Sequence, residues 1–293
     1  PPIQEQALLR RHAPHPASAV GGMKFAEFQR RGRLDRDEVA AFAAGYRPDA
    51  AARVIEVNAR QVYEAGRLTT LTSWLEALPP ELLDSRPQLL RVRGKALLEL
   101  GRPREALQWL SQSRERFAEA NDLAGASRTQ VEEAEARRLL GQFAEAIALS
   151  RESLVLLERV ADPVVRAKAY LNLGITLCQQ GEMREGIPAL REALSQYDEL
   201  GDLFSVGMTH HDLGVALRRS GDLAASEFHF QQALARYEQV GDHGRASHTL
   251  NSLGVGLHLQ GKYDEALQVY TQAQDKGSTS CIIASYWAAA GVQ

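Results

Sequence analysis

Apolar residues recur along this chain at helical spacing, in amphipathic runs that glycines interrupt at regular intervals. From residue 87 onward these runs predict consecutive pairs of helices. The expected pairs cover 87–100 and 103–119, 122–140 and 143–159, 162–180 and 183–199, 202–220 and 223–239, and 242–260 and 263–275. The pattern therefore indicates an all-α chain built from helix hairpins.

Small residues return every forty residues and set the register of these hairpins. The first set is Gly94, Ala134, Gly174, Gly214 and Gly254, and seven residues later stand Gly101, Gly141, Gly181, Gly221 and Gly261. The later glycines suit the left-handed conformation that ends a helix. A second small residue follows twelve after each of the first set, at Ala106, Ala146, Gly186, Ser226 and Ala266. It falls on the second helix, so the two backbones can approach closely.

Between hairpins an aspartate recurs, at Asp122, Asp162, Asp202 and Asp242. Aspartate at a helix start accepts hydrogen bonds from free backbone amides, which predicts a cap at each position. Pro188 falls within the first turns of its helix and is expected to cause at most a mild kink.

Stacked hairpins with this pattern resemble tetratricopeptide repeats, since an alanine is followed four residues later by an aromatic residue or leucine, as at Ala266 and Tyr270. The resemblance implies an all-α, right-handed superhelical solenoid with units of about 40 residues, longer than the common unit of about 34. We expect a flexible lead (1–22), irregular helical units (23–90) that include a link of at most one turn at "LPPELLDSRP", the repeat array (91–275), and a non-repeat C-terminal helix or tail (276–293).

Residues 52–110 are similar to the start of the helical sensor array in MalT-type ATP-dependent transcriptional regulators of the LuxR class. The resemblance rests on "GRLTTLTSWLEALP" (66–79) and "RPQLLRVRGKALLELGR" (86–102). It implies an inducer-binding sensor that lies between an ATP-binding module and a DNA-binding helix-turn-helix. Neither a phosphate-binding G-x-x-x-x-G-K-[ST] motif nor a helix-turn-helix is discernible here, so we expect this chain to be the sensor region alone.

Composition narrows the class of protein. With 24% charged residues, 44% hydrophobic residues and a net charge of −3, the chain is an ordinary polypeptide without a basic footprint for nucleic acid. Two distant cysteines, Cys178 and Cys281, argue against a disulfide scaffold, and no apolar run is long enough for a membrane helix. A cytoplasmic, bacterial protein without a cofactor is the expectation.

Candidate binding residues lie on the first helix of each pair, which the resemblance places on the concave face. They are Arg128, Arg138, Lys168, Asn172, His211, Asp212, Arg218, His248, Asn251 and His258. This stripe is apolar in the middle with cations and amides at its edges, and it suits an extended peptide or a small polar ligand. A solvated helical face is the alternative, and Asn172 could instead bond a neighbouring helix. Arg218 and Asn251 are expected outside the core, and Gln196 on the convex surface.

Other chemistry is less favoured. His211, His248 and His258 could converge, but no H-E-x-x-H spacing predicts a metal, and protonation-sensitive contacts or plain surface fit better. Trp74 and Trp109 are expected in the core. Cys178 has no adjacent base, and no paired carboxylates or triad stand out, so no enzyme is predicted.

Three functions remain open. The first is the ligand sensor of a bacterial transcriptional regulator, and the second is a scaffold that holds a partner peptide in its groove. A third is an accessory subunit of an enzyme. The expected partners are a protein, a peptide or a small-molecule inducer, with self-association possible and no direct contact with nucleic acid or membrane.

Overall fold

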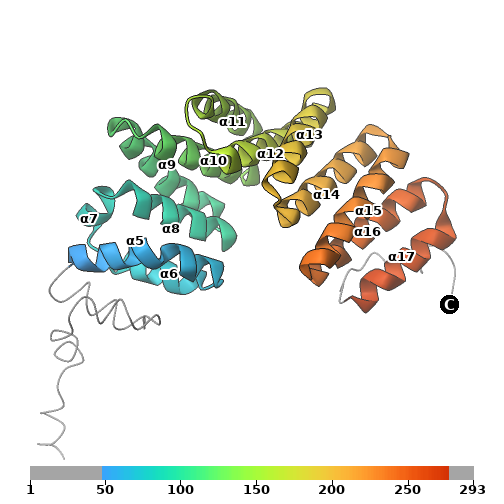
Figure 1. The fold of residues 1–293 in the computed structure, drawn as a ribbon, viewed down its shortest axis with the longest axis horizontal. Coiled ribbons are helices and arrows are strands. Elements are labelled where there is room, and N and C mark those ends of the chain that lie inside the picture. The colour runs from blue at the N-terminus through green and yellow to red at the C-terminus, as the bar shows by residue number, and fades with distance from the viewer. Residues whose placement is uncertain (1–47, 277–293) are drawn as a thin grey trace, which may run out of the picture. The chain divides into compact units, whose positions relative to one another are not determined.

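The structure, a computed structural model, describes residues 48–276, and every element in that range is an α-helix (Figure 1). The predicted lead, residues 23–47 of the irregular units and the tail beyond 276 lie outside the described residues. The chain divides into two compact units, one ending at Leu140 and the other starting at Gly141.

Unit 1 contains six described helices: α5 (Pro48–Glu64), α6 (Leu68–Glu76), α7 (Pro80–Asp84), α8 (Pro87–Glu99), α9 (Pro103–Glu119) and α10 (Leu123–Leu139). The short α7 occupies "LPPELLDSRP", which confirms the predicted one-turn link. Trp74 is buried in the core of α5, α6 and α8, as predicted. Trp109 is only half-buried, because its ring lies at the edge of the core beneath the guanidinium of Arg93, 4.0 Å from the ring centroid.

Unit 2 contains seven described helices: α11 (Phe143–Leu157), α12 (Pro163–Gln180), α13 (Met183–Leu200), α14 (Leu203–Ser220), α15 (Leu223–Val240), α16 (His243–Leu259) and α17 (Tyr263–Asp275). The hairpins α12–α13, α14–α15 and α16–α17 pack as predicted, each pair in extensive contact. α13 continues through Pro188 without a break. Together with α8–α9 of unit 1, these pairs confirm four of the five expected hairpins, and the helices from Pro87 onward have boundaries within two residues of those predicted. The predicted pair 122–140 and 143–159 is not confirmed as a hairpin, because α10 and α11 belong to different units.

The recurring glycines have the two roles that their spacing indicates. Gly181 and Gly221 end α12 and α14 in the left-handed conformation, with φ of +101° and +91°. Gly214 lies at the seam, where the Ser226 hydroxyl of α15 donates a 2.8 Å hydrogen bond to its carbonyl oxygen. The small residue and its partner twelve positions later therefore face each other across the hairpin.

The aspartates between hairpins cap the following helices. Asp122, Asp162, Asp202 and Asp242 each accept a hydrogen bond from the backbone amide three residues later, at 2.8–3.2 Å. These bonds satisfy amides that have no partner within the helix. The predicted caps are confirmed.

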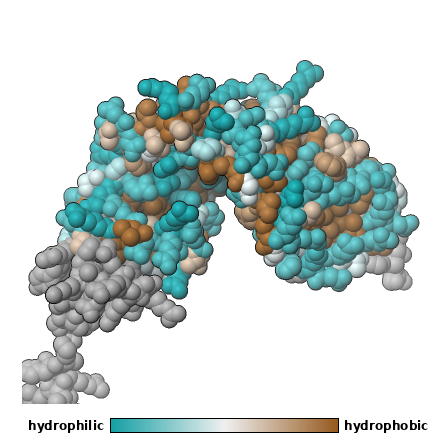
Figure 2. Space-filling model, viewed as in Figure 1, coloured by the Kyte–Doolittle hydropathy of each residue, from teal (hydrophilic) through white to brown (hydrophobic). Residues whose placement is uncertain are grey.

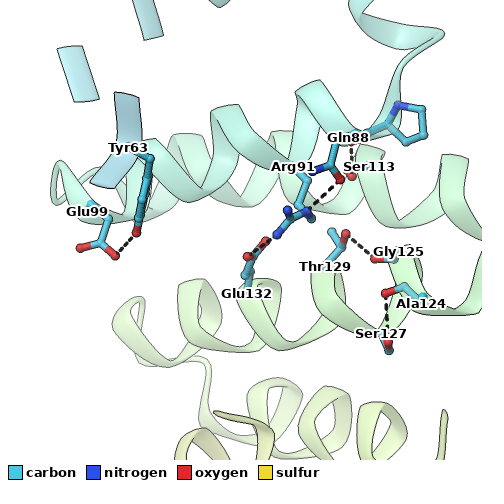
Figure 3. Close-up of polar contacts among 11 residues, drawn as sticks. Tyr63, Gln88, Arg91, Glu99, Ser113, Ala124, Gly125, Ser127, Thr129 and Glu132 are labelled. Carbon is cyan, nitrogen blue, oxygen red and sulfur yellow. Dashed lines mark hydrogen bonds and ion pairs between the residues drawn. The ribbon is translucent and has the colours of Figure 1, made fainter. Parts of the chain in front are cut away.

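Buried ion pairs join the helices of unit 1. Arg91 of α8 donates a 2.7 Å hydrogen bond to Glu132 of α10, and the two side chains point toward each other in Figure 3. Glu133, fully buried, accepts from Arg114 of α9 at 2.8 Å and from Arg137 at 2.9 Å. Because buried carboxylates are costly unless paired, these arginines fix how α8, α9 and α10 pack.

Gln196 was expected on a convex surface, and that expectation is wrong. Its side chain is only 5% exposed. It accepts a hydrogen bond from Arg166 of α12 at 3.2 Å and donates one to Glu192 at 2.7 Å. The seam between α12 and α13 therefore includes a polar position that hydrophobic periodicity does not reveal.

Candidate functional site

The first helices of three successive hairpins are neighbours in unit 2, where α14 contacts both α12 and α16. We call the surface that these three helices share the first-helix face. Eight of the predicted residues lie on its helices: Lys168, Asn172, His211, Asp212, Arg218, His248, Asn251 and His258. Arg128 and Arg138 lie on α10 in unit 1, the former exposed and the latter half-buried.

His211 of α14 and His248 of α16 are brought together on this face. Their ring centroids lie 5.1 Å apart, and His211 also packs against the Phe230 ring at 5.5 Å. The Nδ1 atom of His211 is 3.0 Å from the Thr249 hydroxyl, which in turn donates to the Arg245 carbonyl at 2.8 Å. Both bonds form together when His211 carries its proton on Nδ1, which leaves Nε2 as an acceptor.

The environment of His211 keeps its imidazole neutral. Burial lowers the pKa of His211 to about 4, with further contributions from His248, Arg245 and Arg218. Desolvation and nearby positive charge both disfavour the imidazolium form. At neutral pH the side chain can therefore accept a hydrogen bond from a ligand without carrying charge.

Arginines supply positive charge beside this pair. Arg218 is half-buried, and its Nε atom has no hydrogen-bond partner among the described residues. Arg245 lies over the Phe204 ring, 4.9 Å from the centroid, and pairs with Asp242 at 3.4 Å. A buried guanidinium N–H without a partner is a donor that a ligand oxygen could satisfy.

Other predicted residues are not part of this cluster. Asn172 and Asn251 are buried, 4% and 7% exposed, so the expectation that Asn251 lies outside the core is wrong. His258 lies about 15 Å further along α16 than His248, and its ring packs edge-on against Tyr263 at 5.3 Å. The predicted convergence of three histidines is thus reduced to His211 and His248.

Asp212 and Lys168 are half-buried on the same helices. The negative charge of Asp212 contributes to raising the pKa of Cys178 and of Tyr237, although burial is the main cause in both. Burial raises the Cys178 pKa to about 11, so the thiol stays protonated near neutral pH. Within residues 48–276 no group of three or more His, Cys, Asp or Glu side chains is placed to hold a metal ion.

Sequence reasoning missed Thr249 and Arg245, which act on His211, and Phe204, whose ring lies beneath the Arg245 guanidinium. It also missed a second pair, His210 with His229 of α15, whose Nδ1 atoms lie 2.9 Å apart. The register of the hairpin could have predicted this pair. Because Gly214 faces Ser226 across an antiparallel hairpin, residue 210 lies opposite residue 230 and its neighbours.

Apolar side chains of α14, α15 and α16 reach the surface. In Figure 2, brown hydrophobic patches lie between hydrophilic residues over α14 to α16. Phe204 is 37% exposed, Phe228 55% and Leu259 56%. Of the helices within residues 48–276, none is long and apolar enough to cross a membrane.

Helix hairpins in register, joined by small-residue seams, define an all-α solenoid of the tetratricopeptide kind. Comparison with known families agrees, since residues 165–239 and 205–275 match the tetratricopeptide repeat family. No curated protein matches the chain.

Three solved structures share the fold. BtubC from P. vanneervenii is 16% identical over 89% of this chain and 94% of its own, with a TM-score of 0.59. A Rap protein complexed with competence and sporulation factor is 14% identical over 89% and 78%, with a TM-score of 0.63. A signal transduction ATPase with a tetratricopeptide repeat sensor, from Pyrococcus horikoshii, is 16% identical over 98% of this chain and 49% of its own, with a TM-score of 0.60. At these identities the likeness shows the fold alone.

Proposed function

We propose that unit 2 is a non-enzymatic binding domain whose first-helix face holds an extended, anionic segment of a protein or peptide partner. The observation that carries this proposal is the cluster of His211, His248, Arg218 and Arg245 from two adjacent first helices. It combines an uncharged acceptor, His211, with a buried guanidinium N–H of Arg218 that no described residue satisfies. Carboxylates of a partner would pair with the arginines, and aromatic side chains such as Phe204 would contact its apolar groups.

The likeness to a Rap protein complexed with competence and sporulation factor supports a partner held by such an array. We place the binding domain in the sensor region of a cytoplasmic bacterial transcriptional regulator. The resemblance of residues 66–79 and 86–102 to MalT-type regulators supports this context, as does the likeness to an ATPase with a tetratricopeptide repeat sensor. The parent gene tests the context, since a phosphate-binding loop upstream and a helix-turn-helix downstream are expected.

The binding face is tested with a displayed library of random peptides, followed by calorimetry on the selected sequences. Selected peptides should be enriched in Asp and Glu, and Arg218→Gln should weaken their binding at least tenfold, because a charge-assisted hydrogen bond is lost. Arg184→Gln is the matched control, because Arg184 is an exposed arginine of α13 away from this face. Equal affinity for both variants would show that the peptide does not bind at the first-helix face.

A small-molecule inducer is the alternative ligand for the same residues. Thermal-shift screening of small polar metabolites against the same two variants distinguishes it from a peptide. A metabolite that stabilises the parent and the Arg184→Gln variant but not Arg218→Gln would show that the same site binds a small molecule instead of a peptide.

A further inference from the structure

Side chains cross the junction between α14 and α16 at several levels of the first-helix face. Near the start of the two helices, the Arg245 guanidinium of α16 lies over the Phe204 ring of α14, 4.9 Å from its centroid. Two turns further along α14, the rings of His211 and His248 lie 5.1 Å apart, measured between their centroids. Residues 204 and 211 of α14 therefore both face α16.

Arg218 crosses the same junction two turns beyond His211, from α14 toward α16. A Cβ at position 256 of α16 would lie 3.9 Å from the Cδ atom of Arg218, so the stem of this arginine lies against α16 at Gly256. The Nε atom of Arg218 is buried and has no hydrogen-bond partner among the described residues. Each end of the α14–α16 junction therefore carries one arginine, Arg245 from α16 and Arg218 from α14.

The distance between the two arginines follows from helix geometry. Phe204, His211 and Arg218 are seven residues apart, which is close to two turns, so they lie on one stripe of α14 at intervals of about 10 Å. Arg245 is level with Phe204, and the two cations are therefore separated by roughly 21 Å along the junction. Between them His211 is neutral at pH 7, because burial lowers its pKa to about 4.

We propose that the α14–α16 junction selects partner segments that carry two acidic residues six positions apart, one for Arg245 and one for Arg218. This inference rests on the binding function proposed above and specifies the sequence of the partner. An extended chain advances about 3.3 Å per residue, so a separation of roughly 21 Å corresponds to about six residues. Each carboxylate can then accept charge-assisted hydrogen bonds from the guanidinium at its end.

Arg245 is accessible to such a partner although Asp242 lies beside it. One Asp242 oxygen accepts the backbone amide of Arg245 at 2.9 Å, and the other lies 3.4 Å from the Arg245 Nε atom. The Arg245 side chain is 51% exposed. The Phe204 ring beneath it holds the guanidinium in place through a cation–π contact. An incoming carboxylate therefore meets a positioned cation at this end of the junction.

A separation of six positions also places both carboxylates on the same side of the segment. Side chains repeat every two residues in a β-strand and every three in a polyproline II helix, and six is a multiple of both. His211 lies opposite the middle of the segment, where its Nε2 atom can accept a backbone N–H whatever the sequence. The spacing of the acidic pair is therefore the sequence feature that this junction distinguishes.

The test uses synthetic peptides of about 20 residues with two glutamates at spacings of two, six, ten or fourteen positions. Their background of alanine, serine, threonine and glutamine permits both an extended and a helical conformation. Calorimetry with the whole chain at low ionic strength should show that the spacing of six binds about tenfold tighter than two or ten, because only that spacing engages both arginines. Tightest binding at a spacing of fourteen would indicate a helical partner, which rises about 1.5 Å per residue, and would overturn the proposal.

Double-mutant cycles assign each glutamate to its arginine. In the peptide with a spacing of six, replacing one glutamate by glutamine should weaken binding to the parent protein about tenfold and leave binding to Arg218→Gln nearly unchanged. Replacing the other glutamate should leave binding to Arg245→Gln nearly unchanged. Arg184→Gln, at an exposed position of α13, is the control and should respond to both replacements as the parent does.

The outcomes separate this inference from the proposed function. If Arg218→Gln weakens the binding of every peptide alike, without a preference for the spacing of six, the first-helix face binds its partner but the inferred spacing is wrong. If Arg218→Gln and Arg184→Gln bind every peptide equally, the first-helix face is not the binding site, and both proposals are wrong.

Discussion

The ring of Phe230 occupies the space that a side chain on Gly214 would need, since a Cβ at position 214 would lie 2.7 Å from Cδ1 and Cε1 of that ring. The rigid ring is held between α14 and α16, so it cannot move aside freely. Gly214→Leu should therefore destabilise the protein by overpacking, by about 1–3 kcal/mol. Even Gly214→Ala should be destabilising, although alanine is favoured over glycine inside helices by up to about 1 kcal/mol.

Gly244 of α16 is the matched control for the alanine variant. A Cβ there meets only the Asp242 side chain, at 3.6 Å, so Gly244→Ala should be neutral or stabilising. Gln239→Leu at an exposed position of α15 is the control for leucine and should change stability little. Chemical denaturation measures all four variants, and equally mild effects throughout would contradict the tight seam.

The buried pair of Arg91 and Glu132 should be sensitive to removal of either partner. Their side chains are 16% and 7% exposed, and Arg91→Ala leaves the Glu132 carboxylate buried without that partner. We expect a loss of about 3–5 kcal/mol. Replacing both residues by methionine should restore much of the stability, because no buried charge remains.

Arg60→Ala provides the comparison for this ion pair. Arg60 pairs with Glu64 at 2.8 Å, but the side chains are 89% and 60% exposed. Water screens such a pair, so its loss should destabilise the protein much less than loss of the buried pair. If urea denaturation gives Arg60→Ala and Arg91→Ala the same free energy of unfolding, burial does not determine how much these ion pairs contribute to stability.

Acidification below pH 6.5 should lower the free energy of unfolding of unit 2. The pKa values of His210 and His211 are both lowered to about 4 in the folded state, against about 6.5 in an unfolded chain. Below pH 6.5 the unfolded state binds more protons than the folded state, so stability is fully present above that pH and is lost as the pH falls toward 4. The melting temperature should therefore decrease over this window.

Variants identify the groups responsible for the acid sensitivity. Substituting His210 and His211 by glutamine should flatten the dependence of the free energy of unfolding on pH between 6.5 and 4, whatever the stability at pH 7. His243→Gln, at an exposed position, should leave the slope unchanged. The same slope in the double variant and the parent would show that other groups titrate.

Deletion tests the repeat register. Removing residues 162–201 takes out one complete hairpin, α12–α13, together with its capping aspartate and its closing glycine. Because each hairpin packs on its neighbours, the shortened chain should fold, with a helical circular dichroism spectrum and a compact elution volume. Removing only 182–201 leaves α12 without its partner, and that chain should aggregate or unfold. A well-folded half-unit deletion would refute the forty-residue unit.

The sequence by itself determined the helices from residue 87 onward and four of the five predicted hairpins. Glycines at fixed spacing, aspartates at helix starts and apolar periodicity act within one or two helices, so Gly181, Asp202 and Gly214 have the roles that local rules assign. The first-helix face also follows from the register of the repeats, because that register places His211 and His248 on adjacent first helices, where their rings meet.

Only the tertiary structure decided which polar residues are buried and what they contact. Gln196 and Asn251 look like surface residues in sequence, yet both are buried, because a polar side chain is accepted wherever a neighbouring helix supplies hydrogen bonds or room for it. The pairing of His210 with His229 and the burial of Glu133 among arginines depend on rotation and spacing of helices that periodicity leaves undetermined. Packing between neighbouring helices sets these contacts, and with them the charge state of the buried imidazoles, including His211 at the proposed binding face.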